Sequence, residues 1–335
     1  MHVADPAPLT DSFGRQITYV RLSVTDRCDL RCRYCMAEQM VFLPRSQILT
    51  LEELARLGQV FTGLGVTRIR VTGGEPLARS NVISLFESLG RLAQLRDLTL
   101  TTNGTRLARF AAPLKNAGVT RINISLDSLR PDRFRDTTRV GDLGTVLGGI
   151  EAALAQGFAR LKVNSVILRN RNHDEIVDLA RFALERGMDV CFIEEMPLGT
   201  IGDHDRRETY YSSDAILDDL TRAFDLVAST ETTGGPSRYY RAVGYDGRIG
   251  LISPHSHNFC DSCNRVRITA KGELYPCLGQ NDALHLMPIL REHPGEDAPL
   301  RQAIIDSMGI KPYGHDFTQQ MEAPQVVRFM SMTGG

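Results

Sequence analysis

A strand–turn–helix alternation that repeats along the first 200 residues is the feature that most constrains the fold. Runs rich in branched apolar residues predict strands at 17–23, 66–72, 97–102, 119–126, 161–168 and 189–196. Amphipathic stretches between them predict helices at 50–63, 80–92, 105–116, 143–156 and 174–186. Thr50 with Glu53 three residues later predicts a capping box at the first helix. Each glycine just before a strand is placed as the left-handed residue that ends a helix: Gly65, Gly118, Gly157 and Gly187.

This alternation indicates parallel β/α units joined by right-handed crossovers. Six units are fewer than the eight of a closed barrel, which leaves an open doubly wound sheet or a partial barrel. The chain has no G-x-G-x-x-G after the first strand and no G-x-x-x-x-G-K-[ST] anywhere, so two nucleotide signatures of doubly wound sheets are missing. We therefore predict an α/β fold in which residues 1–200 form a partial (βα)6 barrel of the TIM type.

The sequence changes character after about residue 200. Glycine-rich pieces separate predicted strands near 238–243, 248–253, 265–270 and 273–277, and helices follow near 283–291 and 299–308. The apolar periodicity of this part is too weak for a core of its own. We therefore expect residues 201–335 to form a layer added to the barrel, carrying a second metal site and part of the substrate site.

Charge and hydropathy exclude two classes of partner. The 335 residues carry 39 basic and 40 acidic side chains, so no overall basic field would attract nucleic acid. Asp5, Pro6 and Pro8 interrupt the region where a signal peptide needs an apolar run, and no apolar stretch of about 18 residues occurs. We expect a cytoplasmic protein with neither nucleic acid nor membrane as a partner, in which local cations bind any anionic ligand.

Cysteine is the most informative residue type. Six of the seven cysteines form two groups of three, which we call the N-terminal trio (Cys28, Cys32, Cys35) and the C-terminal trio (Cys260, Cys263, Cys277). The odd number, the chain length and the missing secretion signal disfavour a disulfide framework. The trios are therefore candidate metal or cluster ligands, whereas Cys191 is expected to be a buried strand residue.

Each trio is one thiolate short of the four that a closed zinc site or a saturated iron–sulfur cube requires. A four-iron cluster held by three thiolates would keep one iron open for a ligand. The N-terminal trio directly follows the first predicted strand, and loops after strands form the active face of a β/α barrel. Zinc remains the alternative at both trios: with a fourth ligand from elsewhere at the first, or as a clip on the hairpin 265–277 at the second.

Basic residues accompany these sites. Arg265 and Arg267 lie two apart on a predicted strand, so both guanidiniums point to one face beside the C-terminal trio. Two guanidiniums beside a metal site are better explained as phosphate ligands than as ordinary solvent-exposed residues of a strand edge. Arg21, Arg70 and Lys162 on other predicted strands would add to a positive lining that suits a polyphosphate.

Two motifs together resemble the radical S-adenosylmethionine (SAM) superfamily: the N-terminal trio with Tyr34 before its last cysteine, and Gly73-Gly74-Glu75-Pro76 after the second strand. The segment Tyr19–Cys28, both trios, the Arg-x-Arg and the terminal Gly334-Gly335 extend the likeness over nearly the whole chain. In this wider pattern the chain resembles the GTP 3′,8-cyclase family of molybdenum cofactor biosynthesis.

The resemblance implies a lyase that converts GTP to (8S)-3′,8-cyclo-7,8-dihydroguanosine 5′-triphosphate. It implies two 4Fe-4S clusters and SAM, which is split to methionine and a 5′-deoxyadenosyl radical that abstracts a ribose hydrogen. It also implies a reductant as electron donor and a downstream cyclic pyranopterin monophosphate synthase as partners, and it allows a homodimer.

The same resemblance assigns roles to residues. The N-terminal trio would hold the cluster that binds SAM, and the C-terminal trio would hold the cluster whose open iron faces the purine. SAM would contact Tyr34, Gly74, Ser125 and Met196. GTP would contact Arg21, Arg70, Thr101, Lys162, Arg265, Val266 and Arg267. Gly334 and Gly335 would reach into the active site as catalytic residues, although composition alone predicts a frayed end.

Two positions depart from the family pattern, and two rival functions remain. Glu195 stands before Met196 where an apolar or aromatic residue is more common, and Thr333 stands where isoleucine is common. One rival is a radical SAM enzyme that uses an auxiliary cluster on a peptide, which would leave the Arg-x-Arg unexplained. The other is a zinc-stabilised binding protein.

Overall fold

A single twelve-stranded sheet organises the chain. The computed structural model describes residues 8–199, 204–315, 317 and 326–334. Within them the strand order is β12-β11-β10-β1-β2-β3-β4-β5-β6-β9-β8-β7. The six central strands follow chain order and pair in parallel. They are β1 (Tyr19–Ser23), β2 (Arg68–Thr72), β3 (Asp97–Thr102), β4 (Arg121–Ser125), β5 (Arg160–Ile167) and β6 (Asp189–Glu194).

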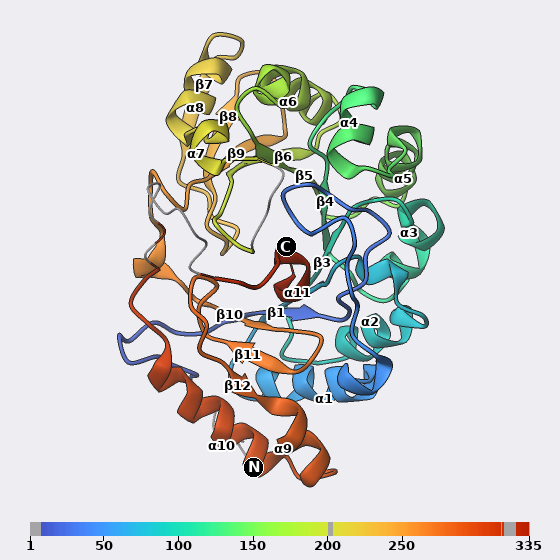
Figure 1. Cartoon of the computed structure of the whole chain (residues 1–335), viewed down its shortest axis with the longest axis vertical. Coiled ribbons are helices and arrows are strands. Elements are labelled where there is room, and N and C mark those ends of the chain that lie inside the picture. The colour runs from blue at the N-terminus through green and yellow to red at the C-terminus, as the bar shows by residue number, and fades with distance from the viewer. Residues whose placement is uncertain (1–7, 200–203, 316, 318–325, 335) are drawn as a thin grey trace.

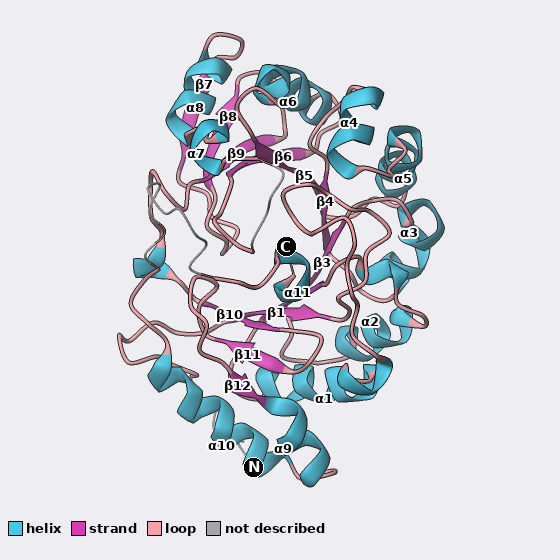
Figure 2. Ribbon diagram, viewed as in Figure 1, coloured by secondary structure: helices cyan, strands magenta, loops and turns pink. Residues whose placement is uncertain are grey.

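Helices between consecutive central strands cover the outer face of the curved sheet (Figures 1 and 2). These are α1 (Leu51–Thr62), α2 (Val82–Gly90), α3 (Leu107–Asn116), α4 (Pro131–Thr138), α5 (Leu143–Ala155) and α6 (Ile176–Leu184). The predicted β/α units are confirmed, with strand and helix ends shifted by one or two residues in most cases. The helix α4 was not predicted.

Local signals explain where these helices begin and end. Thr50 accepts a hydrogen bond from the backbone N–H of Glu53, and Glu53 accepts one from that of Thr50, so the predicted capping box is confirmed. The four glycines predicted to be left-handed have φ of 91°, 87°, 60° and 66° at Gly65, Gly118, Gly157 and Gly187. Apolar helix faces such as Leu54, Leu57 and Phe61 of α1 are fully buried and join one continuous core with the sheet.

The C-terminal strands continue the sheet at both edges, so the part expected to be added to the barrel as a layer extends the same sheet. On one side β9 (Arg248–Ile252) pairs in parallel with β6, followed by antiparallel β8 (Arg238–Ala242) and β7 (Leu226–Ser229). On the other side β10 (Arg265–Ile268) pairs in parallel with β1, followed by antiparallel β11 (Glu273–Tyr275) and β12 (Leu284–His285). The physical reason is that the open edges of β1 and β6 carry backbone groups that need partners.

The other described helices and 3-10 turns lie outside the regular alternation of strands and helices. They are α7 (Arg206–Thr209), α8 (Ser213–Thr221), α9 (Leu286–Glu292), α10 (Asp297–Ser307) and α11 (Met330–Thr333), with 3-10 turns η1 (Arg45–Gln47), η2 (Pro76–Ala78), η3 (His173–Glu175), η4 (Cys260–Ser262) and η5 (Met308–Ile310). The helix expected from residue 283 begins instead at Leu286, because β12 occupies the preceding residues. The helix α11 lies in the middle of the space that the sheet surrounds (Figure 1). Within the described ranges, no helix has both the length and the apolar character to cross a membrane.

Candidate active site

One cavity of about 300 Å³ brings together residues from distant parts of the chain. Both cysteine trios line it, together with side chains from the central strands and the loops that follow them. The predicted residues on its wall are Arg21, Cys28, Cys32, Tyr34, Cys35, Arg70, Gly74, Thr101, Ser125, Lys162, Met196, Cys260, Cys263, Arg265, Arg267 and Cys277. The structure therefore brings these predicted residues together on the wall of one cavity.

The N-terminal trio lies in the loop after β1, where its thiols are largely buried and acidic side chains lie nearby. Cys28 Sγ accepts hydrogen bonds from the backbone N–H of Leu30 at 3.4 Å and from Asn103 Nδ2 at 3.6 Å. Burial raises the pKa of the Cys28 and Cys35 thiols to about 12. Burial also raises the pKa of Cys32 well above its usual range. Such thiols stay protonated until a metal replaces the proton, which is the behaviour of a cysteine ligand set.

The Gly-Gly-Glu-Pro segment packs directly on the start of the cysteine loop. A Cβ on Gly73 would lie 2.6 Å from the Thr25 carbonyl oxygen, and one on Gly74 would lie 2.5 Å from that of Arg27. The backbone N–H of Gly74 donates to Thr25 O at 2.8 Å. The sequence analysis expected glycine here so that a ligand could approach the backbone. The structure adds a second reason, because the backbone of this segment packs directly against that of the cysteine loop.

Glu75 of this motif fixes the loops after two strands. Its carboxylate accepts hydrogen bonds from the backbone N–H of Leu77 at 2.9 Å and of Asn103 at 2.7 Å, and from Thr102 Oγ1 at 2.9 Å. Burial raises the pKa of Glu75 to about 7, although these donors act against that rise. Glu75 thus ties the end of β2 to the loop after β3, beneath the N-terminal trio.

Tyr34 has a partner that the sequence analysis did not single out. Its hydroxyl donates to Asp127 Oδ2 at 2.7 Å, while Asp127 Oδ1 accepts from the backbone N–H of Val166 at 2.9 Å. Burial raises the pKa of Asp127 to about 6. The available signal was position, because Asp127 follows the end of β4 two residues after Ser125, where polar residues meet the cavity.

The basic lining is concentrated where β1, β2 and β10 run side by side. The sheet register places Arg21 between Arg70 and Arg267. Burial lowers the pKa of Arg21 to about 10 and that of Arg267 well below its usual range. Burial alone would raise the pKa of Tyr19, but the Arg70 and Arg21 charges outweigh it and lower that pKa to about 7. A site that disfavours so many positive charges would be stabilised by a bound polyanion.

The other expected GTP contacts differ in how they face the cavity. Thr101 Oγ1 accepts a hydrogen bond from Arg70 Nη1 at 3.3 Å, and Lys162 Nζ lies 3.4 Å from Tyr239 Oη. Arg265 and Arg267 line the cavity, as alternation predicted, whereas the Val266 side chain is 1% exposed and belongs to the core. The Val266 side chain lies on the opposite face of β10, so only the backbone of Val266 is left for the expected contact with GTP.

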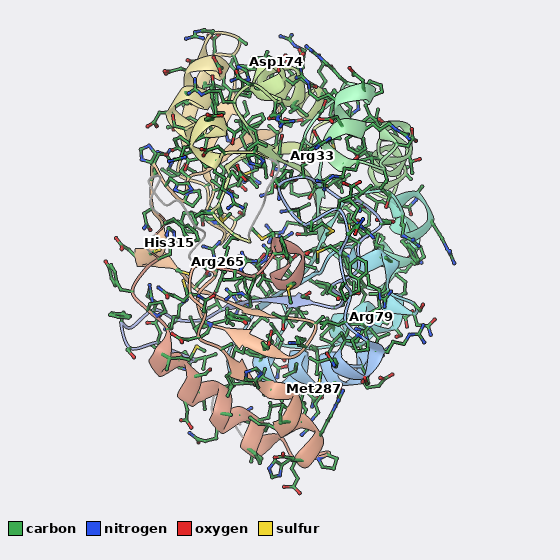
Figure 3. All side chains as sticks on the ribbon, in the orientation of Figure 1. Arg33, Arg79, Asp174, Arg265, Met287 and His315 are labelled. Atoms are coloured by element: carbon green, nitrogen blue, oxygen red, sulfur yellow. The ribbon has the colours of Figure 1, made fainter. Side chains whose placement is uncertain are left out.

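The C-terminal trio lies around the start of β10 and the end of β11, whereas the N-terminal trio follows the end of β1. The setting of the C-terminal trio is more basic. Burial raises the pKa of Cys260 and Cys277, whereas at Cys263 the Arg265 and Lys311 charges outweigh burial and lower the pKa. Figure 3 shows Arg265 and His315 on neighbouring segments beside the central space.

Neither trio converges on a single point. Within the part of the chain that the structure describes, no group of three His, Cys, Asp or Glu side chains is arranged to hold one metal ion. Cys191 is fully buried in β6, as expected.

The C-terminal tail lies against the wall of the site at Gly334. Gly334 is buried, and its carbonyl oxygen accepts a hydrogen bond from Arg267 Nη1 at 2.5 Å. Its φ is 76°, and a Cβ at this position would lie 2.2 Å from Thr72 Cγ2. The frayed end predicted from composition is therefore wrong for Gly334. Gly335 lies outside the described residues.

The two departures from the family pattern have structural roles. Glu195 accepts hydrogen bonds from His204 Nε2 at 2.9 Å and from Arg206 Nε at 3.1 Å, and Arg206 Nη2 donates to Leu198 O at 2.6 Å. Glu195 thereby braces the loop that carries Met196. Separately, the Thr333 hydroxyl donates to the backbone of α11.

Comparison with known families divides the chain in two. Residues 22–183 match the Radical SAM superfamily, and residues 188–317 match the family described as Molybdenum Cofactor Synthesis C. The boundary between the two matches falls just before β6.

Individual proteins give a more specific likeness. A GTP 3′,8-cyclase of Saccharophagus degradans is 59% identical over 327 residues, which are 98% of each chain. A GTP 3′,8-cyclase of Ectopseudomonas mendocina is 57% identical over 98% of each chain. Among solved structures, Streptococcus suis SuiB bound to precursor peptide SuiA has a TM-score of 0.63 at 12% identity, covering 96% of this chain and 77% of that one. The last likeness concerns the fold alone.

Proposed function

The chain belongs to the GTP 3′,8-cyclase family, radical SAM enzymes that convert GTP in molybdenum cofactor biosynthesis, and from this premise we propose how its residues divide that reaction. One observation carries the proposal. Two cysteine trios and a group of buried arginines line a single cavity, although they come from opposite ends of the sequence. A radical enzyme with a polyphosphate substrate needs this combination.

The N-terminal trio would hold a 4Fe-4S cluster. Each thiolate of such a cluster binds a different iron, so the sulfurs need not meet at one point as they do around a zinc ion. The N–H donors of Leu30 and Asn103 on Cys28 Sγ fit a thiolate ligand. When bound, this cluster supplies the electron that splits SAM. Tyr34, Gly74, Ser125 and Met196 line the adjoining wall and would orient SAM there.

The C-terminal trio would hold a second 4Fe-4S cluster that also lacks a fourth thiolate. The positive charges of Arg265 and Lys311 would stabilise the negative charge of the deprotonated cysteines that hold the cluster. The second cluster would line the same cavity as the first, next to the arginines. Its open iron could then receive the purine of GTP.

The arginines would hold the triphosphate. Arg21, Arg70 and Arg267 lie at matching positions on three adjacent strands, so their guanidiniums form a row along one wall. Charge-assisted bonds from guanidinium to phosphate are among the strongest hydrogen bonds in proteins. Thr101 and Lys162, deeper along the sheet, would contact the nucleoside.

The tail would close this site. Gly334 lies against Thr72 and Arg267, so the tail reaches the end of β2 as well as the phosphate wall. Its presence would help to exclude water and hold the ribose in a reactive position.

We further propose a division of the fold that follows this chemistry. Residues 1–200 would form a partial (βα)6 barrel that carries the SAM site. Residues 201–335 would supply the second cluster, much of the GTP site and the tail. The parallel order of β1 to β6, in which neighbours in sequence are neighbours in the sheet, supports the barrel type over a doubly wound sheet.

The experiment is an anaerobic incubation of the reconstituted protein with SAM, dithionite and one purine triphosphate at a time. We expect 5′-deoxyadenosine and a cyclised nucleotide with GTP, and far less of the nucleotide product with ATP. A colourless protein with about two zinc ions and no iron would contradict the proposal, because two closed zinc sites would then explain the cysteines. Efficient SAM cleavage with no cyclised product from any triphosphate would contradict the substrate assignment.

A further inference from the structure

Lys311 is a buried cation beside the C-terminal trio. It follows η5 and is 2% exposed, which is rare for a lysine unless its ammonium is fully paired. Its Nζ donates to Pro276 O at 2.7 Å and to Arg265 O at 3.1 Å, and it lies 3.6 Å from Cys263 Sγ. Three donors therefore meet three acceptors.

These acceptors come from two separate parts of the metal site. Cys263 and Arg265 belong to the entry into β10, whereas Pro276 directly precedes Cys277 after β11. The ammonium thus joins the two segments that bring Cys263 and Cys277 together. Because both carbonyl contacts are made by one rigidly held group, Lys311 fixes the separation of these two ligands.

Among the residues that the structure describes, no carboxylate forms an ion pair with Lys311. Among the described residues, its partners are two neutral carbonyls and the Cys263 sulfur. Burying an ammonium without a counter-charge is costly, so the anionic group that best offsets it is the cysteine ligand set itself. At the N-terminal trio, the donors to Cys28 Sγ are instead the neutral N–H groups of Leu30 and Asn103.

We propose that Lys311 positions Cys263 and Cys277 and, through its charge and its N–H···S contact, raises the reduction potential of the cluster that the C-terminal trio holds. The inference rests on the proposed second cluster. Reduction adds negative charge to a cluster, so a nearby cation and a donor to sulfur stabilise the reduced form more than the oxidised form. Arg265, which also lies near Cys263, acts in the same direction.

The test compares Lys311→Gln, which keeps a donor but loses the charge, with Lys311→Arg, which keeps both. Lys271→Gln is the matched control, because Lys271 is a half-exposed lysine in the turn between β10 and β11. All three changes are placed in the full chain carrying Cys28→Ser, Cys32→Ser and Cys35→Ser, so that only the C-terminal cluster contributes. Iron per chain and the midpoint potential from an EPR-monitored redox titration are measured.

We expect a lower midpoint potential for Lys311→Gln, and values near the parent for Lys311→Arg and Lys271→Gln. If Lys311→Gln loads poorly with iron, restored loading in Lys311→Arg supports the same conclusion. A parent-like potential in a fully loaded Lys311→Gln protein would overturn the proposal. Equal iron loss in Lys311→Gln and Lys311→Arg would also overturn it, because the site would then depend on the shape of the lysine side chain and not on its charge. A parent protein that binds no iron at all would instead overturn the second cluster, and the role of Lys311 with it.

Discussion

Arg267 donates a hydrogen bond from Nη1 to the carbonyl oxygen of Gly334 at 2.5 Å. One arginine therefore joins the wall proposed to bind triphosphate to the tail proposed to close the site. Its neighbour on the same face of β10, Arg265, lies instead against the Phe259 ring, with its guanidinium carbon 5.2 Å from the ring centroid. The two arginines should consequently differ in what their removal does.

Arg265→Ala and Arg267→Ala should each weaken GTP binding while leaving iron content and SAM binding unchanged. A charge-assisted bond is worth roughly 1.5–3 kcal/mol, so affinity should fall about tenfold to a hundredfold in equilibrium binding. Arg267→Ala should also lower the rate of cyclisation at saturating GTP, because the tail loses its anchor. Arg222→Ala, at an exposed arginine of α8's C-terminal end, is the control. Unchanged GTP affinity in both variants would place the phosphate site elsewhere.

Deleting Gly334 and Gly335 should abolish formation of the cyclised nucleotide without unfolding the protein. The pair has no side chains to remove from a core, so the melting temperature, the iron content and SAM binding should stay near wild type. Some SAM cleavage should persist without formation of the cyclised product. A truncated protein with full cyclase activity would show that the tail has no part in the reaction.

Gly334→Ala tests the same tail without shortening it. The positive φ of 76° and the 2.2 Å approach of a Cβ to Thr72 Cγ2 leave no room for alanine. We expect most cyclase activity to be lost, measured as product per 5′-deoxyadenosine formed. Gly148→Ala is the control, since a Cβ there meets nothing within 4 Å. Equal activity in the two variants would contradict the tail placement.

Removing the C-terminal trio should halve the iron. Anaerobic reconstitution of the wild type should give about eight irons per chain, and the Cys260→Ser/Cys263→Ser/Cys277→Ser variant about four. The remaining iron should still support SAM binding, because the N-terminal trio lies in a separate loop, after β1. Loss of all iron in this variant would contradict two independent clusters.

Asp127 should make the metal-free protein less stable as the pH rises. Its folded pKa of about 6 lies above the ordinary value of 3.8, so its effect on stability is most favourable at low pH and is lost as pH rises through about 6. Asp127→Asn keeps an acceptor for the Val166 N–H and removes the buried charge. Thermal unfolding from pH 4 to 8 should show a smaller decline for the variant, with a difference of at most about 3 kcal/mol. Parallel curves would contradict the raised pKa.

The sequence predicted the elements whose patterns are strong and missed those whose patterns are weak. In α4 only Phe134 and Thr138 are buried, and β7 has no buried residue, so neither shows an apolar period. The strands β8, β9, β10 and β11 were located, but their place in the sheet was not. Strand pairing depends on contacts between distant segments, which a local pattern does not encode.

The same distinction applies to the site. Alternation along β10 was enough to predict that Arg265 and Arg267 share a face, whereas the burial of Val266 on the other face was not part of the prediction. Asp127 and Glu75, by contrast, take their roles from the backbone N–H groups of Val166 and Asn103, on other segments. Such partners become visible only once the strands are placed side by side.

The pairing of β10 with β1 has a consequence for how the protein is made. During synthesis, β1 emerges among the first residues, and β2 can cover one of its edges soon afterwards. The other edge has no native partner until the ribosome has added Arg265–Ile268, near the end of the chain. For most of translation the nascent chain therefore exposes an unpaired strand bearing Arg21, and its charge would discourage β1 from joining a neighbouring chain.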